Sequence, residues 1–327
     1  MNRWALVALG AVATLAGAAA IAGQVLSGAQ PWGPTLADNM VFAKAIPFTI
    51  GLGIVVGAIR GLGAHTSPVE RRGAVRRFSP GTAALHWVAA LGFLLALVSG
   101  AWQYLKGILD VDSPVYMPFV YRVHYVGATL LLFAMSSMVT YWWIGGAREL
   151  VPPPGQRIRH LRGLAHELPG ALGGLVGGLL GLDMKRQPPA VGQFTYYETT
   201  VSFPTWVILL ALVTVTGLLK AMRYVYPIPG ELLWWASALH IAGLVLLAAK
   251  LLDHLRYVFA PSRWPLLRAM VSTWIDRRCV ERAHPAWHRQ LQEARESPSA
   301  TPETPRPPQT SPTPPPTPAV GSTRGGE

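Results

Sequence analysis

Long uninterrupted apolar stretches constrain this chain more than any other feature of its sequence. Six of them approach the roughly twenty residues that an α-helix needs to cross the hydrocarbon core of a bilayer. Charged residues make up only 13% of the 327 residues, against about 25% in ordinary globular domains. The sequence therefore predicts an all-α integral membrane protein. The six stretches run over residues 5–23, 43–60, 82–104, 119–144, 201–220 and 232–259.

The two ends of the chain differ from this apolar middle. Met1-Asn2-Arg3 and the Ala/Leu/Gly run after it fit both a retained helix and a cleavable signal peptide. The last thirty residues hold ten of the 29 prolines, a composition typical of disorder. The expected parts are residues 1–24 as a transmembrane helix or signal peptide, 41–62 as an additional transmembrane helix, 78–260 as a four-helix core with a cytoplasmic loop at 145–198, 261–296 as a cytoplasmic C-terminal segment, and 297–327 as a disordered tail.

Basic residues predict the orientation, because cytoplasmic loops collect Lys and Arg. The loop before the third stretch and the loop at 145–200 are rich in Arg, whereas residues 24–42 and 105–118 contain no Arg. We therefore expect a multi-pass protein of the cell inner membrane with a cytoplasmic C-terminus. The net charge of +12 follows from this topology and does not indicate nucleic-acid binding.

Two further features narrow the chemistry. Cys279 is the only cysteine, which excludes an internal disulfide, a Cys-ligated iron–sulfur cluster and covalent haem attachment. Any metal chemistry must therefore use histidine. The segment 170–181 is too short to span a membrane and too rich in glycine for a stable isolated helix, so we expect an interfacial or re-entrant segment.

Histidine is the residue type that carries candidate chemistry. Ionisable groups at membrane depth are expensive and are functional by default. We expect the remaining histidines, which lie in loops or in the tail, to be solvated and to bind no metal: these are His65, His160, His166, His284 and His288. Four others fall inside or at the edge of apolar stretches: His86, His124, His240 and His254.

The spacing of these four predicts two pairs. His240 and His254 lie on one helix, roughly 21 Å apart along its axis and within about 40° of the same face. His86 matches the depth of His254, and His124 matches the depth of His240. Two stacked pairs from different helices are what bis-histidine haem b needs, since each axial face of the iron takes one imidazole. Four glycines near them are expected to let a macrocycle lie against the backbone: Gly92, Gly127, Gly217 and Gly243.

A weak internal similarity supports two comparable helix pairs. Phe78-Ser79 followed by Leu95-Ala96-Leu97-Val98-Ser99-Gly100 is similar to Phe194-Thr195 followed by Leu210-Ala211-Leu212-Val213 and Thr216-Gly217. Both runs lead from the cytoplasmic side into an apolar stretch.

Several short motifs together resemble a known family over roughly residues 70–290. The motifs are Arg77-Phe78-Ser79 before His86-Trp87, Tyr121-Arg122-Val123-His124, Gly192-Gln193-Phe194-Thr195, the pair His240 and His254 fourteen residues apart, and the segment from Glu281 to Trp287. They resemble the cytochrome b (gamma) subunit of respiratory formate dehydrogenases, which is similar to the cytochrome b subunits of nickel–iron hydrogenases and other molybdenum oxidoreductases.

The resemblance implies a four-helix dihaem cytochrome b core, here with one or two additional N-terminal transmembrane helices. It implies two haem b groups, with His86 and His254 holding the cytoplasmic one and His124 and His240 the outer one, and a quinone beside the cytoplasmic haem. It also implies an iron–sulfur electron-transfer subunit and a catalytic subunit as partners, in addition to membrane lipid.

The sequence departs from the family pattern near the expected quinone end. Ser79 replaces an Asn, and Thr82 and Ala83 replace an acid and an Arg. Thr195 replaces a second Asn, and Glu198 stands near an expected Gln-Lys. These departures bear on the quinone site and on formate as the substrate.

Three cations near the histidines have two interpretations each. Lys250 lies one turn before His254, and either extends to the headgroups or contacts a haem propionate or quinone. Arg122 and Arg223, near the outer pair, either pair with propionates or lie among headgroups.

The predicted function is electron transfer from a peripheral, formate dehydrogenase-like enzyme through two b haems to quinone. The chain itself would not oxidise the substrate. Two alternatives remain open: a cytochrome b subunit of a hydrogenase or other molybdopterin oxidoreductase, and a haem-free proton or metal transporter that uses the intramembrane histidines.

Overall fold

The structure of the chain is a computed structural model. It describes residues 3–26, 34–64, 69–109, 112, 114–145, 150–152 and 155–296. His65 and the proline-rich segment 297–327 lie outside the described residues.

Six long helices within the described residues confirm the predicted membrane spans. Each is long and apolar enough to cross a bilayer, and large apolar side chains such as Val98, Val139 and Leu252 are more than 60% exposed on them, as lipid-facing residues are. The protein is a multi-pass membrane protein. The long helices are α1 (Arg3–Leu26), α2 (Pro34–Leu62), α3 (Pro80–Leu109), α4 (Met117–Gly145), α7 (Phe203–Met222) and α8 (Gly230–Phe259).

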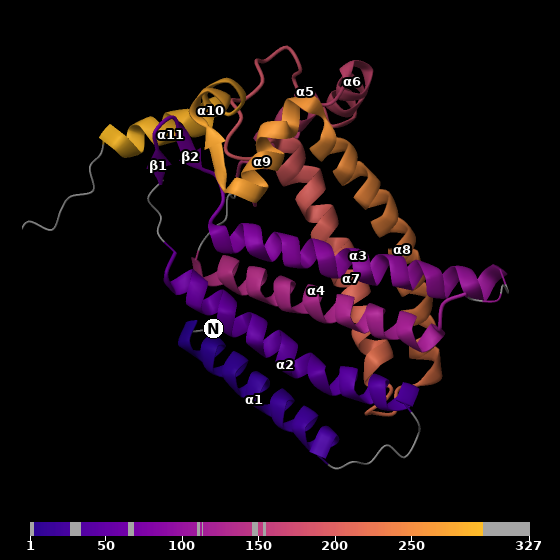
Figure 1. Ribbon diagram of the computed structural model, residues 1–327. Coiled ribbons are helices and arrows are strands. Elements are labelled where there is room, and N and C mark those ends of the chain that lie inside the picture. Colours follow the sequence, from indigo (N-terminus) through magenta and orange to yellow (C-terminus); the bar gives the residue numbers. More distant parts are fainter. Residues whose placement is uncertain are drawn as a thin grey trace, which may run out of the picture.

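The long helices form two groups (Figure 1). Helices α1, α2, α4 and α3 pack side by side in that order, and α7 packs along α8 as a second group that meets the first mainly through α2 and α3. Phe93, Leu131, Leu209 and Leu247, one from each of α3, α4, α7 and α8, form an apolar cluster between the groups. These four helices are the core that carries the predicted histidines.

Glycines allow α2 to approach α4 closely. A Cβ atom at Gly53, Gly57 or Gly61 would lie within 3 Å of the α4 residues Ser136, Ser137 and Ile144 respectively. Glycines four residues apart are typical of helix contacts in membranes, where close backbones replace the hydrophobic driving force.

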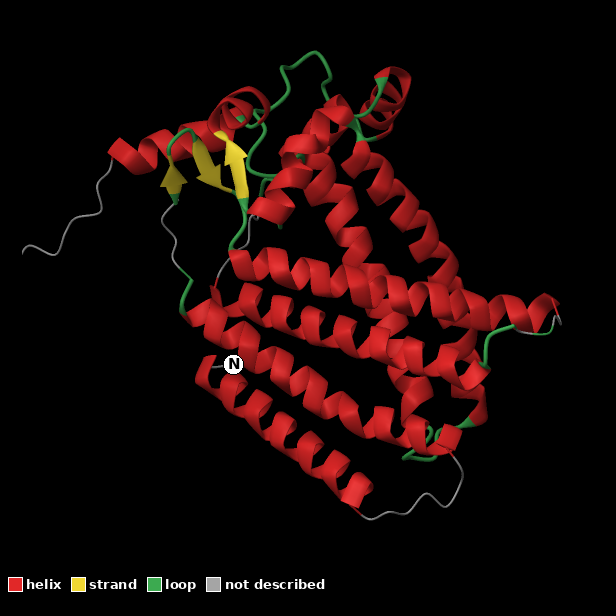
Figure 2. Ribbon diagram, in the orientation of Figure 1, coloured by secondary structure: helices red, strands yellow, loops and turns green. Residues whose placement is uncertain are grey.

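Smaller elements cover one end of the bundle, which we call the capped end; the opposite end is the open end. Figure 2 shows the short strands grouped there beside helices. The capping elements are β1 (Glu70–Arg71), β2 (Ala74–Arg76), β3 (Trp274–Asp276), α5 (Arg157–Glu167), α6 (Gly170–Leu179), η2 (Pro261–Arg263), α9 (Trp264–Ser272), α10 (Arg277–Ala283) and α11 (Pro285–Glu296).

The three strands form an antiparallel sheet in the order β1-β2-β3, with Val75 opposite Ile275. Both of these side chains are buried with Val280, Trp287 and Leu291. This second, small core joins the segment before α3 to the segment after α8. The sequence did not predict it, because strands of two or three residues leave no alternating pattern to detect.

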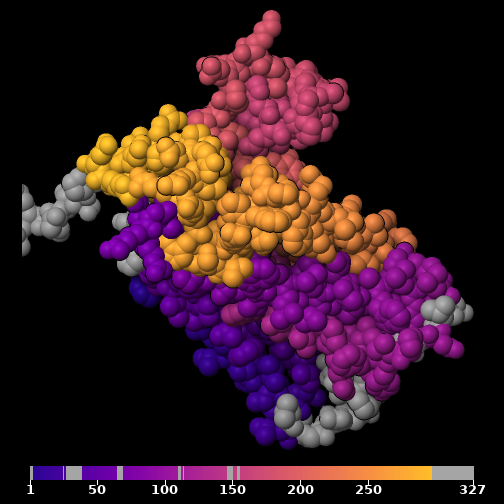
Figure 3. All heavy atoms as spheres, turned by 45° about the horizontal axis from the view of Figure 1, so that its top comes forward, coloured from indigo at the N-terminus to yellow at the C-terminus, as the bar shows by residue number. Residues whose placement is uncertain are grey.

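The glycine-rich segment forms the short helix α6, which packs on α5 and so is not an isolated helix; its interfacial or re-entrant position stays a prediction. In α6, a Cβ at Gly173 would meet the carbonyl oxygen of Ala165 at 2.2 Å, and one at Gly177 would meet the Met184 side chain at 2.6 Å. Packing on α5 thus stabilises a helix whose intrinsic propensity is poor. The space-filling view shows the region of α5 and α6 standing out at this end, beside α10 and α11 (Figure 3).

Candidate functional site

Two predicted histidines meet near the open end. His124 of α4 and His240 of α8 have ring centroids 6.3 Å apart and ring planes 71° apart. Imidazole nitrogen bonds a metal ion at about 2 Å, and the centre of the ring lies about 1 Å further out. Two imidazoles on opposite faces of one iron therefore have centroids about 6 Å apart. The pair fits bis-histidine ligation.

Each of these rings is held by the helix that precedes it in the chain. The Nδ1 atom of His124 lies 3.2 Å from Ser99 Oγ and 3.0 Å from the carbonyl oxygen of Ala96 on α3. The Nδ1 atom of His240 lies 3.0 Å from Thr216 Oγ1 on α7. The Nε2 atoms are thus the nitrogens available to a metal.

The other two predicted histidines approach each other toward the capped end. His86 of α3 and His254 of α8 are close enough for their charged forms to repel each other. The Trp206 ring lies edge-on to His254 at 5.8 Å. Trp87, next to His86, donates its Nε1–H to the carbonyl oxygen of Met270 in α9 at 3.2 Å, which ties this part of α3 to the cap.

Lys250 lies beside His254 and is only 6% exposed. Its Nζ donates to Asp253 at 2.8 Å and to Ser202 Oγ at 3.1 Å. Asp253 also accepts from Tyr197 Oη and from Arg256, whose side chain is 73% exposed. A chain of hydrogen bonds therefore runs from the surface at Arg256 to the buried ammonium group.

Ser202 reaches Lys250 from a π-helical turn, η1 (Glu198–Ser202), that leads into α7. Turns of this kind are rare and occur frequently at functional sites.

A buried arginine and histidine lie within the cap. Arg77 donates from Nη1 to Nε2 of His284 at 3.4 Å, and His284 Nδ1–H donates to the carbonyl oxygen of Gly192 at 2.7 Å. The Arg77 guanidinium stands over the rings of Phe194 and Trp287 at 5.2 and 5.8 Å. His284 is 1% exposed, so the prediction of a solvated His284 is wrong. Burial and the nearby Arg77 and Arg263 charges lower its pKa to about 4.

The departures from the family pattern occupy helix N-termini. Ser79 Oγ accepts from the backbone N–H of Thr82 at 3.1 Å, as an N-cap of α3. Thr195 and Glu198 form a reciprocal capping box, in which Glu198 Oε2 accepts from the Thr195 N–H at 2.7 Å and Thr195 Oγ1 from the Glu198 N–H at 3.1 Å. These side chains begin the helices that carry the site.

One cation near the open-end pair was missed as a site residue. Lys220 of α7 interacts electrostatically with both His124 and His240. It lies four residues after Thr216, so spacing along the helix placed both on one face. Arg223 donates to Tyr224 Oη at 2.6 Å and is exposed, as is Arg122. Propionate contacts at Arg122 and Arg223 stay predictions.

Three of the four glycines expected beside a macrocycle have another role. A Cβ at Gly92 would lie 2.8 Å from the Gly127 carbonyl oxygen, and one at Gly127 would lie 2.6 Å from the Ala96 nitrogen. One at Gly243 would meet Val213 at 2.5 Å. That expectation is wrong for these three, because protein already fills the space. Gly217, in contrast, lies against the His240 ring.

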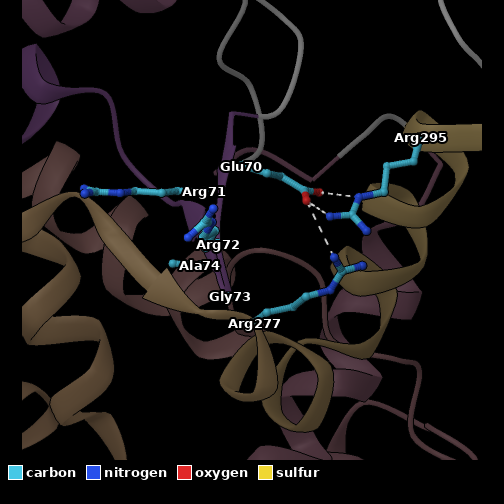
Figure 4. Close-up of a pocket in the computed structure, with 7 residues that line it drawn as sticks. All are labelled: Glu70, Arg71, Arg72, Gly73, Ala74, Arg277 and Arg295. Carbon is cyan, nitrogen blue, oxygen red and sulfur yellow. Dashed lines mark hydrogen bonds and ion pairs between the residues drawn. The ribbon is translucent and has the colours of Figure 1, made fainter.

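A hollow of about 240 Å³ lies apart from the histidines, in the cap (Figure 4). Arg277 and Arg295 both extend to the Glu70 carboxylate, and Arg71 points away from it. These ion pairs tie β1 to α10 and α11. None of the lining residues is a predicted site residue: they are Glu70, Arg71, Arg72, Gly73, Ala74, Arg277 and Arg295.

Six apolar helices in the described residues, with a histidine pair drawn from two of them, fit a membrane cytochrome b. The family model described as prokaryotic cytochrome b561 matches residues 77–273, and the chain belongs to that family. Membership implies haem b binding and a role in electron transfer. No curated protein sequence matches the chain.

Proposed function

We propose that this chain is the membrane subunit of a respiratory oxidoreductase, with two haem b groups that connect a peripheral electron donor to the quinone pool. His124 and His240 would hold the open-end haem, and His86 and His254 the capped-end haem. The observation that carries the proposal is the 6.3 Å separation of the His124 and His240 rings. Haem b, when bound, supplies reversible one-electron chemistry.

The quinone would bind toward the capped end. Lys250 is a buried ammonium group beside His254, and the Asp253 carboxylate that accepts from it is itself 29% exposed, so Asp253 would take up protons from the surface and return them to the lysine. Arg256 stays protonated and would hold the carboxylate in place. Reduction of a quinone requires protons as well as electrons, so a proton-delivering group belongs beside the last electron carrier. Arg-rich loops favour a cytoplasmic location for this end, in the inner membrane.

The electron donor would be an iron–sulfur subunit that docks at the open end and is itself fed by a catalytic subunit. The resemblance to formate dehydrogenase gamma subunits favours a formate dehydrogenase-like enzyme, and a hydrogenase or another molybdopterin enzyme is the alternative. Inward electron transfer with proton uptake from the cytoplasm would build membrane potential, which is worth about 2.3 kcal/mol per charge per 100 mV.

The test is a reduced-minus-oxidised absorption spectrum of the purified full chain, with pyridine haemochrome quantification. We expect two haem b per chain. His124→Ala and His254→Ala should each lose one haem, and the two variants should lose different ones.

Two results would contradict the proposal. A folded protein without haem absorption would favour the alternative function, a proton or metal transporter that uses the intramembrane histidines. One haem that disappears in both variants would contradict the two-pair assignment.

A further inference from the structure

The open-end site is built twice from the same local parts. Ser99 on α3 contacts His124 on α4, 25 residues later, and Thr216 on α7 contacts His240 on α8, 24 residues later. Gly127 follows His124 by three residues, and Gly243 follows His240 by three. The internal similarity in the sequence is therefore structural, although its register differs: Leu95 corresponds to Leu212 rather than to Leu210, as the hydroxyl contacts described next show.

Both hydroxyls make the same bonds within their own helices. Ser99 Oγ–H points to the carbonyl oxygen of Leu95, at 2.5 Å, and Thr216 Oγ1–H to that of Leu212, at 2.7 Å. Each hydroxyl has a single hydrogen, and a carbonyl oxygen can only accept. The hydroxyl oxygen must therefore accept a hydrogen bond from the imidazole that it touches.

This fixes the tautomer of both rings. If the hydroxyl accepts, Nδ1 carries the hydrogen and Nε2 keeps its lone pair for a metal. A hydrogen bond from Nδ1–H to an oxygen also raises the basicity of the ligating nitrogen. The same reasoning applies to His124 and to His240. Each ring also hydrogen-bonds a backbone carbonyl three residues before the hydroxyl, Ala96 for His124 and Val213 for His240, and a carbonyl acceptor requires the same tautomer.

The glycine that follows each hydroxyl-bearing residue leaves space for the histidine ring. A Cβ at Gly100 would lie 3.2 Å from Cε1 of His124, and one at Gly217 would lie 3.2 Å from Cε1 of His240. The equal distances show that the two rings lie in the same way on the two helices.

The π-helical turn η1 keeps the two hydroxyls in equivalent positions, although the segment from the N-cap to the hydroxyl is one residue longer before Thr216 than before Ser99. The contact hydroxyl lies 20 positions after the N-cap residue of α3 (Ser79 to Ser99) and 21 positions after the N-cap residue of the helical segment that contains η1 and α7 (Thr195 to Thr216). In a regular helix one extra residue rotates everything beyond it by about 100°. The wider turn at Glu198–Ser202 accommodates the extra residue, so that Thr216 faces His240.

We propose that Ser99 and Thr216 are a matched pair of positioning residues that, together with the backbone carbonyls of Ala96 and Val213, hold the tautomer and ring orientation of the open-end haem ligands. This inference rests on the proposed function, because it assumes that His124 and His240 ligate haem. In the described part of the chain, the rings of His86 and His254 have no hydroxyl partner of this kind. The effect of the hydroxyls is therefore confined to the open end.

The experiment uses the purified full chain with Ser99→Ala, Thr216→Val and the double variant. Ser136→Ala and Thr205→Val are the matched controls, because those hydroxyls bond the carbonyl four residues earlier in the same manner but touch no histidine. Ser99→Thr and Thr216→Ser keep a hydroxyl and serve as conservative replacements. The readouts are haem affinity, the midpoint potential of each haem and the ferric EPR spectrum.

We expect the test variants to bind the open-end haem about 10- to 100-fold more weakly, the range for loss of a group that orients a metal ligand. The midpoint potential of that haem should rise, because a less basic ligand stabilises ferric iron less. The angle of 71° between the two imidazole planes predicts a highly anisotropic low-spin EPR signal from the ferric open-end haem. This signal should shift in the variants as the angle between the imidazole planes changes. The capped-end haem, the controls and the conservative variants should stay as in the unmodified chain.

Unchanged potential and EPR signal in a double variant that still binds two haems would overturn the inference and leave the proposed function intact. Equal shifts in the controls would also overturn it, since they would assign the effect to helix stability. Absence of haem from the unmodified chain would instead contradict the proposed function.

Discussion

At the open end, His124 and His240 are each held by a hydroxyl from the preceding helix, whereas at the capped end His86 and His254 lie among residues that are distant in the chain. The contacts there join residues far apart: Trp87 reaches Met270, and Arg77 reaches His284. The open-end site thus follows from helix hairpins, and the capped-end site depends on how the cap folds over α3 and α8. Contacts with the preceding helix thus fix the ring orientations at the open end, and contacts between distant segments position the ligands at the capped end.

The largest expected effect comes from filling the open end. Gly217→Val adds two methyl groups beyond a Cβ position that is already 3.2 Å from the His240 ring, so the ring must move. Haem content should fall from two per chain to one, with the capped-end haem retained. Gly107→Val is the control, because a Cβ there meets nothing within 4 Å. Pyridine haemochrome quantification checks this, and two haems in Gly217→Val would show that the ring has room to shift.

The next effect is at the capped end. Lys250→Met keeps a long apolar side chain and removes the proton donor. Haem content should stay the same, and quinone-dependent reoxidation of the reduced protein should slow by about 100-fold to 10,000-fold, the usual contribution of a general acid. Lys106→Met, at the far end of α3, should leave the rate unchanged. Stopped-flow spectroscopy measures it, and an unaffected rate in Lys250→Met would exclude Lys250 as the donor.

The smallest effect is the response of the cap to acid. His284 is neutral in the folded cap, with a pKa of about 4 against 6.5 when unfolded. Between these values the unfolded segment binds more protons, so stability falls as the pH drops through this range. The neutral His284 contributes about 3 kcal/mol to the free energy of unfolding of the cap above pH 6.5, and this contribution is lost below pH 4.

Hydrogen exchange in α10 and α11, corrected for the intrinsic rate, measures this response. Protection should decrease from pH 7 to pH 4.5. His284→Gln retains a donor and an acceptor but does not titrate, so its protection should not vary. Equal pH dependence in both proteins would assign the change to another group.

The same contrast explains what the sequence could predict. Six spans and four histidines followed from apolar stretches and helical spacing, and the spans lie where they were expected. The burial of His284 and the sheet around Val75 and Ile275 depend on pairing between segments about 200 residues apart, for which a single sequence has no local pattern. The roles of Gly92 and Gly127 were misjudged because a glycine that admits a cofactor and one that admits a helix look identical in sequence.

Helix α2 lies outside the residues that match the family, yet it covers one face of α4, which belongs to the matching part. Two of the spaced glycines of α2, Gly53 and Gly57, fit against small α4 residues, of which Ser137 is fully buried. Asn39 bonds Tyr125, the neighbour of His124. A shortened chain that begins at residue 77 would expose a face of α4 made of serine and threonine to lipid. Relatives without such a helix should therefore carry larger apolar residues at the positions of Ser136, Ser137 and Thr140, so the make-up of this one face should reveal how many spans a member of the family has.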